Sequence, residues 1–234
     1  MRMLVISDLH ANWPALEAVL AAEPYDHLLV VGDLVSYGPH AREVIEYVRR
    51  HAALAVRGNH DEALAHEVDC RCAPASKPLA EATRARHREQ LTADQVAFLG
   101  GLPATASLTA GGLTLFAVHA SPRDHFYRYT LTPGAPDEHL AEETSEVEAD
   151  YVLLGHTHLP LARRVGPRML VNPGSVGQPR DGDPRASYAV IEGGDVQLKR
   201  VAYDIEQTVL DLGALGLSED VTDRLTSILR TGAA

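Results

Sequence analysis

Short apolar runs recur along the chain, and most of them end in polar residues. The runs are MLVISDLH (3–10), LLVVGD (28–33), LAVRGNHD (54–61), LTLFAVHAS (113–121), YVLLGHTH (151–158) and MLVNPGS (169–175). Apolar runs of this length, bounded by turn-forming residues, are typical of buried strands. Because side chains alternate between the two faces of a strand, we expect Asp8 and His10 to point to the same side at the end of the first run.

Helical patterns separate the first three runs. Residues 14–23 follow Asn12, a suitable helix cap, and residues 41–51 have apolar side chains at helical spacing. A β-α-β-α-β order of elements is typical of a parallel sheet. Residues 187–204 instead indicate two antiparallel strands around a Gly-Gly turn. The expected fold is therefore mixed α/β.

Much of the remaining chain is expected to be helical. Residues 62–112 are expected to form a helical insertion between strands, and residues 218–230 a terminal amphipathic helix. The acid-rich segment 137–150 is expected to be a solvated helix face. Because the chain has 234 residues and no Pro- or Gly-rich linker, we expect a single domain over residues 1–234.

The charge of the chain narrows its range of partners. It has 21 Lys and Arg against 32 Asp and Glu, a formal net charge of −11. This balance disfavours stable binding to nucleic acid or to an anionic membrane surface, and a nuclease with a long basic groove is not favoured. An anionic substrate would therefore need a local positive site, such as a metal or a few placed arginines.

Cysteine usage and the N-terminal pattern bear on the compartment. Cys70 and Cys72 are so close in an extended segment that they are poorly placed to form a disulfide with each other, and they do not indicate secretion. The first residues lead directly into an apolar run without a signal-peptide pattern, and no apolar run has membrane-spanning length. We expect a cytoplasmic protein that does not enter a membrane.

Five of the apolar runs end in side chains that can take part in a metal site. These residues are Asp8, His10, Asp33, Asn59, His60, His119, His156 and His158. Each alone has an ordinary explanation, such as a turn or a buried histidine bonded to backbone. Oxygen and imidazole ligands without thiolate suit Mn, Fe, Co, Ni or Zn ions better than they suit a structural zinc site. Together, and in this order, they predict a metal centre.

The ordered set DLH, GDL, GNHD, VHAS and GHTH resembles the signature of the calcineurin-like metallophosphoesterases over residues 8–158. The segments DLVSYGP (33–39) and NPGSVGQPRDGDPR (172–185) resemble its prokaryotic branch of predicted phosphodiesterases. The resemblance implies a four-layer α-β-β-α sandwich, in which two mixed β-sheets pack face to face with helices outside. It also implies two divalent metal ions, with Mn expected first and Fe, Zn, Ni or Co as alternatives.

Carried over motif by motif, the resemblance divides the ligands between two ions. The first ion would take Asp8, His10, Asp33 and His158, and the second would take Asp33, Asn59, His119 and His156. Asp33 would bridge the ions, because a carboxylate has two oxygens. In GHTH the histidines alternate with Gly155 and Thr157, so both would project to one side, one toward each ion.

The resemblance also implies a mechanism. A hydroxide that bridges the two metals would attack phosphorus, and His60, which is not a ligand in the family, would protonate the leaving alkoxide. Asp61 would orient His60 and keep it cationic. The alternative for Asp61 is an N-cap of the helix that begins at Glu62.

Four residues are candidates for contact with substrate: Arg180, Arg123, Asn12 and Tyr37. Arg180 would bind phosphate, or alternatively would pair with Asp181 or Asp183 in a surface turn. Protein phosphatases and the symmetrical dinucleoside tetraphosphatases follow the bridging aspartate with Asp-Arg-Gly, whose arginine grips phosphate. This chain has Ser36 and Tyr37 in that neighbourhood, so those two substrate classes are not favoured.

We therefore expect a binuclear metal-dependent phosphoesterase that acts on small or nucleotide-type phosphodiesters. A phosphomonoesterase or protein phosphatase with the same site is the first alternative. The second is a metallophosphoesterase fold that has lost catalysis and serves as a binding scaffold. That alternative predicts eroded ligands, whereas every ligand position and His60 are intact here. The sequence predicts no particular oligomeric state.

Overall fold

The computed structural model describes residues 1–233 and contains two five-stranded β-sheets. In order across the first sheet, the strands are β10 (Asp195–Val201), β9 (Ala186–Glu192), β1 (Arg2–Ile6), β2 (His27–Val30) and β3 (Ala52–Ala55). Across the second sheet they are β4 (Thr105–Ala110), β5 (Leu113–Val118), β6 (Tyr151–Leu153), β8 (Arg168–Asn172) and β7 (Leu161–Val165). Both sheets are mixed, since β1, β2 and β3 are parallel, as are β5, β6 and β8, while the other neighbours are antiparallel.

Eight helices accompany the sheets within the described residues. They are α1 (Trp13–Ala22), α2 (Ala41–His51), α3 (Asn59–His66), α4 (Lys77–Gln90), α5 (Ala93–Gly101), α6 (Asp137–Glu143), α7 (Ile205–Gly213) and α8 (Glu219–Thr231). The predicted cap of α1 is confirmed, because the Asn12 side chain accepts a hydrogen bond of 3.3 Å from the N–H of Ala15. Among residues 1–233, no helix combines the length and the apolar character needed to cross a bilayer.

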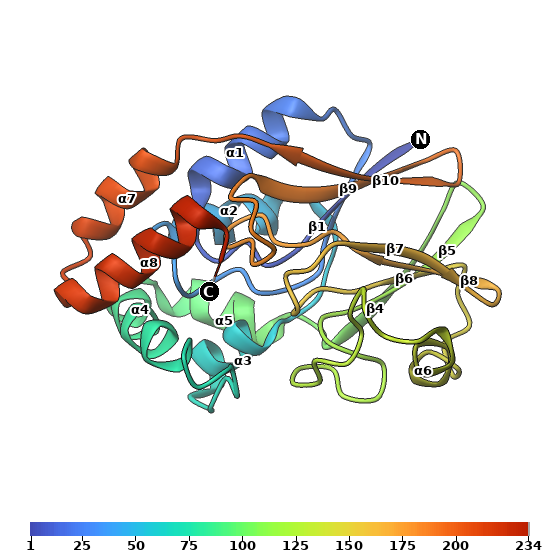
Figure 1. The fold of residues 1–234 in the computed structure, drawn as a ribbon, viewed down its shortest axis with the longest axis horizontal. Coiled ribbons are helices and arrows are strands. Elements are labelled where there is room, and N and C mark those ends of the chain that lie inside the picture. Colours follow the sequence, from blue (N-terminus) through green and yellow to red (C-terminus); the bar gives the residue numbers. More distant parts are fainter. Residues whose placement is uncertain (234) are drawn as a thin grey trace.

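The two sheets pack face to face, and helices cover their outer faces (Figure 1). Val5 of β1 and Ala117 of β5 lie in one apolar cluster, which fills the space between the sheets. Leu4 of β1 points the opposite way, into a cluster with residues of α1 and α2. On the far side of the molecule, Leu140 of α6 packs with Val152 of β6. The expected four-layer α-β-β-α sandwich is confirmed.

The segment 62–112 is helical only over its first part. Helices α3, α4 and α5 lie within residues 59–101, with a ten-residue connection between α3 and α4, but residues 105–110 form the edge strand β4. This strand pairs antiparallel with β5 across a turn at Gly111 and Gly112, which have φ values of 59° and 79°. The pairing with β5 overrides the helical expectation at this end of the segment.

Cys70 and Cys72 are joined in a disulfide, so the expectation that they would not pair is wrong. Arg71 between them has a φ of 49°, which turns the chain and brings the two Cα atoms to 5.3 Å apart. The segment is therefore not extended as expected, and the separation is a common one for disulfides.

Candidate metal centre

The predicted ligands meet beyond the ends of the strands, in the loops that follow them. Strands β1 and β6 end before their ligands begin, so the expected alternation of side chains along a strand is not what positions these residues. Asp8, His10, His156 and His158 instead have φ values of 54°, 44°, 67° and 60°, in the left-handed region that non-glycine residues rarely adopt. Backbone strain of this kind is concentrated at functional sites, where the surrounding structure maintains it.

Two glycines allow these loops to approach one another closely. A Cβ atom on Gly58 would lie 2.1 Å from Oδ1 of Asp33. A Cβ atom on Gly155 would lie 2.1 Å from Oγ of Ser7 and 3.0 Å from Oδ2 of Asp8. Any larger residue at either position would displace a carboxylate or its support.

Asp8, His10 and His158 form the first of two groups of potential ligands. Nε2 of His158 lies 3.2 Å from Oδ1 of Asp8 and 3.0 Å from Nε2 of His10. Nε2 of His10 lies 3.9 Å from the same carboxylate oxygen, and all three side chains are buried. Ligands that share one transition-metal ion are separated by roughly 3 to 4 Å, so these atoms are spaced as such ligands would be.

Asn59, His119 and His156 form the second group, and Asp33 lies between the two. Oδ1 of Asn59 is 3.1 Å from Nε2 of His119 and 3.0 Å from Nδ1 of His156. Oδ2 of Asp33 is 3.2 Å from Nε2 of His119 and 3.8 Å from Nε2 of His10. Asp33 therefore reaches both groups, which is the placement that a bridging carboxylate needs.

Backbone carbonyls orient three of these histidines. At distances of 2.5 to 2.9 Å, Nδ1 faces a carbonyl oxygen in three pairs: His10 with Val35, His119 with Val31, and His158 with Gln178. A carbonyl oxygen only accepts, so each Nδ1 carries a proton and donates it, which leaves Nε2 as the nitrogen available to a metal. The two Nε2 atoms of His10 and His158 then face each other across 3.0 Å, and a proton or a cation between them is needed to avoid opposing lone pairs.

The cluster also contains a buried oxygen without a donor. Oδ1 of Asp8 makes no hydrogen bond within residues 1–233, although Nε2 of His158 lies 3.2 Å from it. Buried polar atoms are nearly always paired, and an unpaired one costs about 1 to 3 kcal/mol. A cation would satisfy this oxygen together with the opposed imidazoles, and the mixture of carboxylate, amide and imidazole ligands suits divalent transition metals. The residues present therefore fit the ions that the resemblance implies.

Local charges hold most of these groups in protonation states that can bind metal. Burial raises the pKa of Asp8 and Asp33, but His158 and His119 outweigh it and hold both pKa values below the usual range. Burial, followed by the charge of His158, lowers the pKa of His10 and keeps that imidazole neutral. Burial opposes the charge of His119, yet Asp33 raises its pKa to about 9. A metal would have to displace that proton.

His60 lies beside the ligand groups without joining either of them. It is the second residue of α3, and its buried ring lies 5.2 Å from the ring of His10. Its Nε2 is 3.4 Å from the hydroxyl of Tyr37, whereas its buried Nδ1 has no partner in the described part of the chain. Burial lowers the pKa of His60 to about 4, so the imidazole is neutral near pH 7 when no anion is bound.

Asp61 bonds to backbone rather than to His60. Its Oδ2 accepts hydrogen bonds from the N–H groups of Asp33 and Gly58, at 2.9 and 3.0 Å, and its Oδ1 accepts one of 2.8 Å from the N–H of Leu34. Helix α3 begins at Asn59 and not at Glu62 as expected, so Asp61 is its third residue, and from there its carboxylate caps the helix and fixes the loop that carries Asp33. These contacts fit a helix cap and not a group that orients His60.

Two of the four predicted substrate residues are engaged elsewhere. The buried side chain of Asn12 uses its whole hydrogen-bonding capacity on four groups, those of Gly177, Tyr203, Ala15 and Thr208. Arg123 forms an ion pair of 3.0 Å with Glu142 on the surface. Asn12 thus supports the loops behind the ligands, and Arg123 is committed to a carboxylate.

The other two, Tyr37 and Arg180, lie together near His60. Cζ of Arg180 is 5.7 Å from the centroid of the Tyr37 ring. Arg180 donates to the side-chain amide oxygen of Gln178 and forms no ion pair with any described residue. The aspartates at 181 and 183 pair with other arginines, so the alternative of a surface ion pair for Arg180 is not observed.

Two residues of α4 support the site and were not predicted from the sequence. The N–H of Ser36 donates to Nδ1 of His87 at 3.3 Å, and Nε2 of His87 donates to the carbonyl of Gly38 at 2.9 Å. The N–H of Tyr37 donates to Oγ1 of Thr83 at 2.9 Å. The helical segment thus holds the loop between Asp33 and Tyr37, and no local pattern in the sequence indicates this long-range contact.

Tyr129 was also missed. Its ring packs against that of His156 in a tilted arrangement, with centroids 3.7 Å apart and planes at 32°. The aromatic run HFYRY shortly after His119 was the available signal for it.

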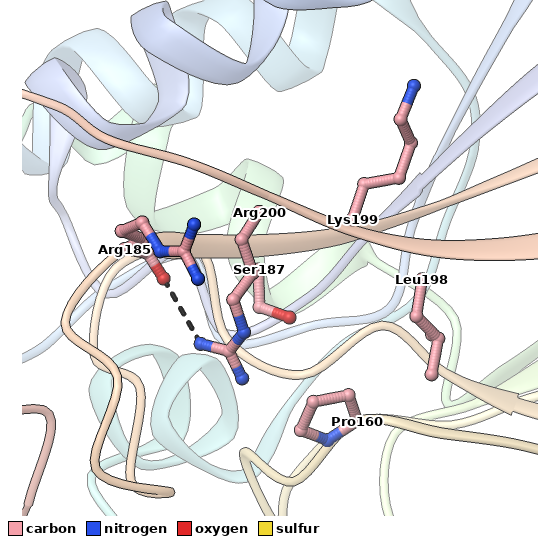
Figure 2. Close-up of a pocket in the computed structure, with 6 residues that line it drawn as sticks. All are labelled: Pro160, Arg185, Ser187, Leu198, Lys199 and Arg200. Atoms are coloured by element: carbon pink, nitrogen blue, oxygen red, sulfur yellow. Dashed lines mark hydrogen bonds between the residues drawn. The ribbon is translucent and has the colours of Figure 1, made fainter.

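A surface pocket of about 450 Å³ contains none of the predicted site residues (Figure 2). It is lined by Pro160, Arg185, Ser187, Leu198, Lys199 and Arg200. Each of its three cations is paired with a carboxylate: Arg185 with Asp183, Arg200 with Asp181, and Lys199 with Glu23. Its charges are therefore already balanced within the protein.

Comparisons with known proteins agree with this architecture. A family model described as the calcineurin-like phosphoesterase superfamily domain matches residues 1–195. A crystal structure of a metallophosphoesterase from Sphaerobacter thermophilus is 35% identical, with a TM-score of 0.81 over 97% of this chain and 99% of that one. A hypothetical protein from Pyrococcus horikoshii has the same fold, at 23% identity and a TM-score of 0.84 over 100% and 99% of the two chains. The phosphodiesterase YfcE of Escherichia coli is 27% identical over 207 residues, which cover 82% of this chain and 88% of YfcE.

Proposed function

This chain belongs to the calcineurin-like phosphoesterase superfamily and is a phosphoester hydrolase, and we propose that it cleaves small or nucleotide-type phosphodiesters with two divalent metal ions. One ion would be held by Asp8, His10, Asp33 and His158, and the other by Asp33, Asn59, His119 and His156. The opposed Nε2 atoms of His10 and His158, with the unpartnered Oδ1 of Asp8 beside them, carry this proposal. Only a cation or a proton can make such an arrangement favourable.

The ligand charges favour an anionic substrate. When bound, two divalent ions supply Lewis acidity that lowers the pKa of water toward neutrality and offsets the charge of a phosphoryl group. Asp8 and Asp33 contribute two negative charges against the four positive charges of two such ions. The loaded site therefore keeps a net positive charge within an acidic protein, and phosphate is attracted there.

His60 would deliver a proton to the leaving group. A bound phosphate anion stabilises the protonated imidazole and raises the pKa of His60 from its low value in the substrate-free protein. His60 then gives its proton to the oxygen of the departing alkoxide. The hydroxyl of Tyr37, 3.4 Å from Nε2, fixes the direction of the ring.

The contacts near Arg180 favour a diester over a monoester. Arg180 supplies one positive charge, and burial raises the pKa of Tyr37 so that its hydroxyl stays neutral. A diester carries one negative charge and a monoester near neutral pH carries about two. A site with one arginine beside the metals thus matches the diester, and the name phosphodiesterase of the relative YfcE supports the same choice.

The test is hydrolysis by metal-stripped protein reloaded separately with Mn, Ni, Co, Zn or Mg. The substrates are bis-p-nitrophenyl phosphate and p-nitrophenyl phosphate, and stripped protein without added metal is the control. We expect metal-dependent cleavage that favours the diester. Preference for the monoester would replace the phosphodiesterase assignment by a phosphatase, and inactivity with every metal would favour the binding scaffold.

A further inference from the structure

Tyr129 covers a potential metal ligand from outside. It belongs to the loop of residues 119–136, between β5 and α6, and its ring packs, tilted by 32°, against the imidazole of His156 with centroids 3.7 Å apart. Tyr129 is nevertheless 40% exposed to solvent, and its hydroxyl makes no hydrogen bond within residues 1–233. An aromatic ring that touches the centre and also faces solvent is available to a ligand.

The loop that carries Tyr129 is anchored on both sides of its turn. Oδ1 of Asp124 accepts hydrogen bonds from the N–H groups of Phe126 and Tyr127, at 3.3 and 3.1 Å. The rings of Phe126 and Tyr127 lie beneath guanidinium groups, with Cζ of Arg57 and Arg71 at 5.5 and 4.4 Å from their centroids. Tyr129 is thus presented by a held loop, which reduces the entropy lost when a ligand stacks on it.

The ring of Tyr129 both contacts the ligand cluster, through His156, and reaches the surface. Tyr37, beneath Arg180, is buried and unavailable for stacking, which leaves Tyr129 as the accessible ring.

We propose that Tyr129 is a specificity residue, whose exposed ring stacks on an aromatic group, such as an aryl or nucleobase moiety, attached to the phosphate bound at the metal centre. This inference rests on the proposed function for the position of the phosphate. It adds to that function a preference among phosphate compounds that differ only in their organic group.

The test measures binding of phenylphosphonate and methylphosphonate to the Mn-loaded protein by calorimetry. Neither probe is hydrolysed, and they differ in the aromatic group. We expect the native protein to bind phenylphosphonate about tenfold more tightly, Tyr129→Leu to lose most of that ratio, and Tyr129→Phe to keep it. Tyr47→Leu, on α2 and outside the loop that carries Tyr129, is the matched control and should keep the ratio.

The outcomes separate this inference from a structural role and from the proposed function. Affinity for methylphosphonate should change less than twofold in Tyr129→Leu. Equal losses for both probes would mean that Tyr129 only steadies His156, and an unchanged ratio would mean that the ring is not used; either result overturns the inference. A Tyr129-dependent ratio in a protein that hydrolyses no diester would uphold the subsite and overturn the proposed function instead.

Discussion

The buried ligand cluster beyond the strand ends and the surface pocket of Figure 2 both gather charged and polar side chains. The pocket is lined by three cations, and each already has a carboxylate partner. In the cluster, two imidazole nitrogens of His10 and His158 face each other at 3.0 Å, and a carboxylate oxygen of Asp8 has no donor. The pocket is the more open feature, yet its electrostatics are complete without a ligand.

The difference shows which property identifies a site. A concentration of charge on a surface can be balanced internally, and such pairs contribute little to stability or to binding. Buried groups that remain unmatched are costly, and they persist when something outside the chain completes them. Here the strained φ values fall on the same residues as the unmatched atoms, and both observations point to a cation site.

Removing the shared carboxylate should have the largest effect. Asp33→Asn replaces the carboxylate that would bind both cations by a neutral amide. We therefore expect both metals to be lost or bound with altered stoichiometry, and kcat/KM to fall by at least about a thousandfold. Elemental analysis and diester hydrolysis measure the two effects. Asp183→Asn makes the same chemical change beside the surface pocket and should alter neither. Two retained metals in Asp33→Asn would place the bridge elsewhere.

The next largest effect is expected at His60, which is in the cluster's neighbourhood but outside its ligand set. In His60→Ala, both metals should remain, while turnover of diesters with poor leaving groups falls by about a hundredfold or more. The loss should be smaller for p-nitrophenyl esters, whose leaving group needs no proton. Metal content and kcat for the two substrate types measure this, and a metal-free variant would contradict the assignment.

The sequence was sufficient for the fold and for the gathering of the ligands. The apolar runs are strands, and the side chains at their ends come together. Asp8 and His10 nevertheless do not project from a strand as expected, because they lie beyond β1 with left-handed φ values. Proximity survived that error because it depends on parallel strands ending at one edge of each sheet, not on the alternation of side chains.

The supporting residues could not be predicted in the same way. From the sequence alone, Asn12 could be a helix cap or a substrate ligand. The hydrogen bonds that decide between them include those to Gly177 and Tyr203, which are remote in sequence. Arg123 lies close to His119 in the chain but turns away to Glu142. His87 is 51 residues from Ser36, which its ring supports, so only the tertiary structure reveals its role.

His87 provides a buried histidine in which both ring nitrogens are satisfied by backbone, in contrast to those of the cluster. Burial lowers its pKa to about 4 in the folded protein, against the ordinary value of 6.5. Below pH 6.5 the imidazole of His87 is protonated in the unfolded chain, whereas in the folded chain it becomes protonated only near pH 4. The free energy of unfolding therefore falls as the pH drops from 6.5 to 4. Between pH 7 and pH 5, His87 should lower the free energy of unfolding by about 2 kcal/mol.

The variant His87→Gln keeps a donor and an acceptor but cannot titrate. Urea unfolding of both proteins at pH 7, 6 and 5 should show a smaller loss of stability in His87→Gln, and the difference between the two proteins isolates this residue because the cluster is common to both. Parallel pH dependence in the two proteins would mean that the folded state accepts a proton on His87.

The smallest effects are expected at two arginines, Arg180 near the ligand cluster and Arg185 in the surface pocket. Arg180 has no carboxylate partner among the described residues and lies over Tyr37, so Arg180→Ala should raise KM for a diester by about tenfold. Arg185 is paired with Asp183 and exposed, and Arg200 would keep that carboxylate paired in its absence, so Arg185→Ala should change kcat/KM less than twofold. Steady-state kinetics on one substrate measure both. Equal losses would mean that the balanced pocket also binds substrate, and the distinction between matched and unmatched charge would then fail to identify the site.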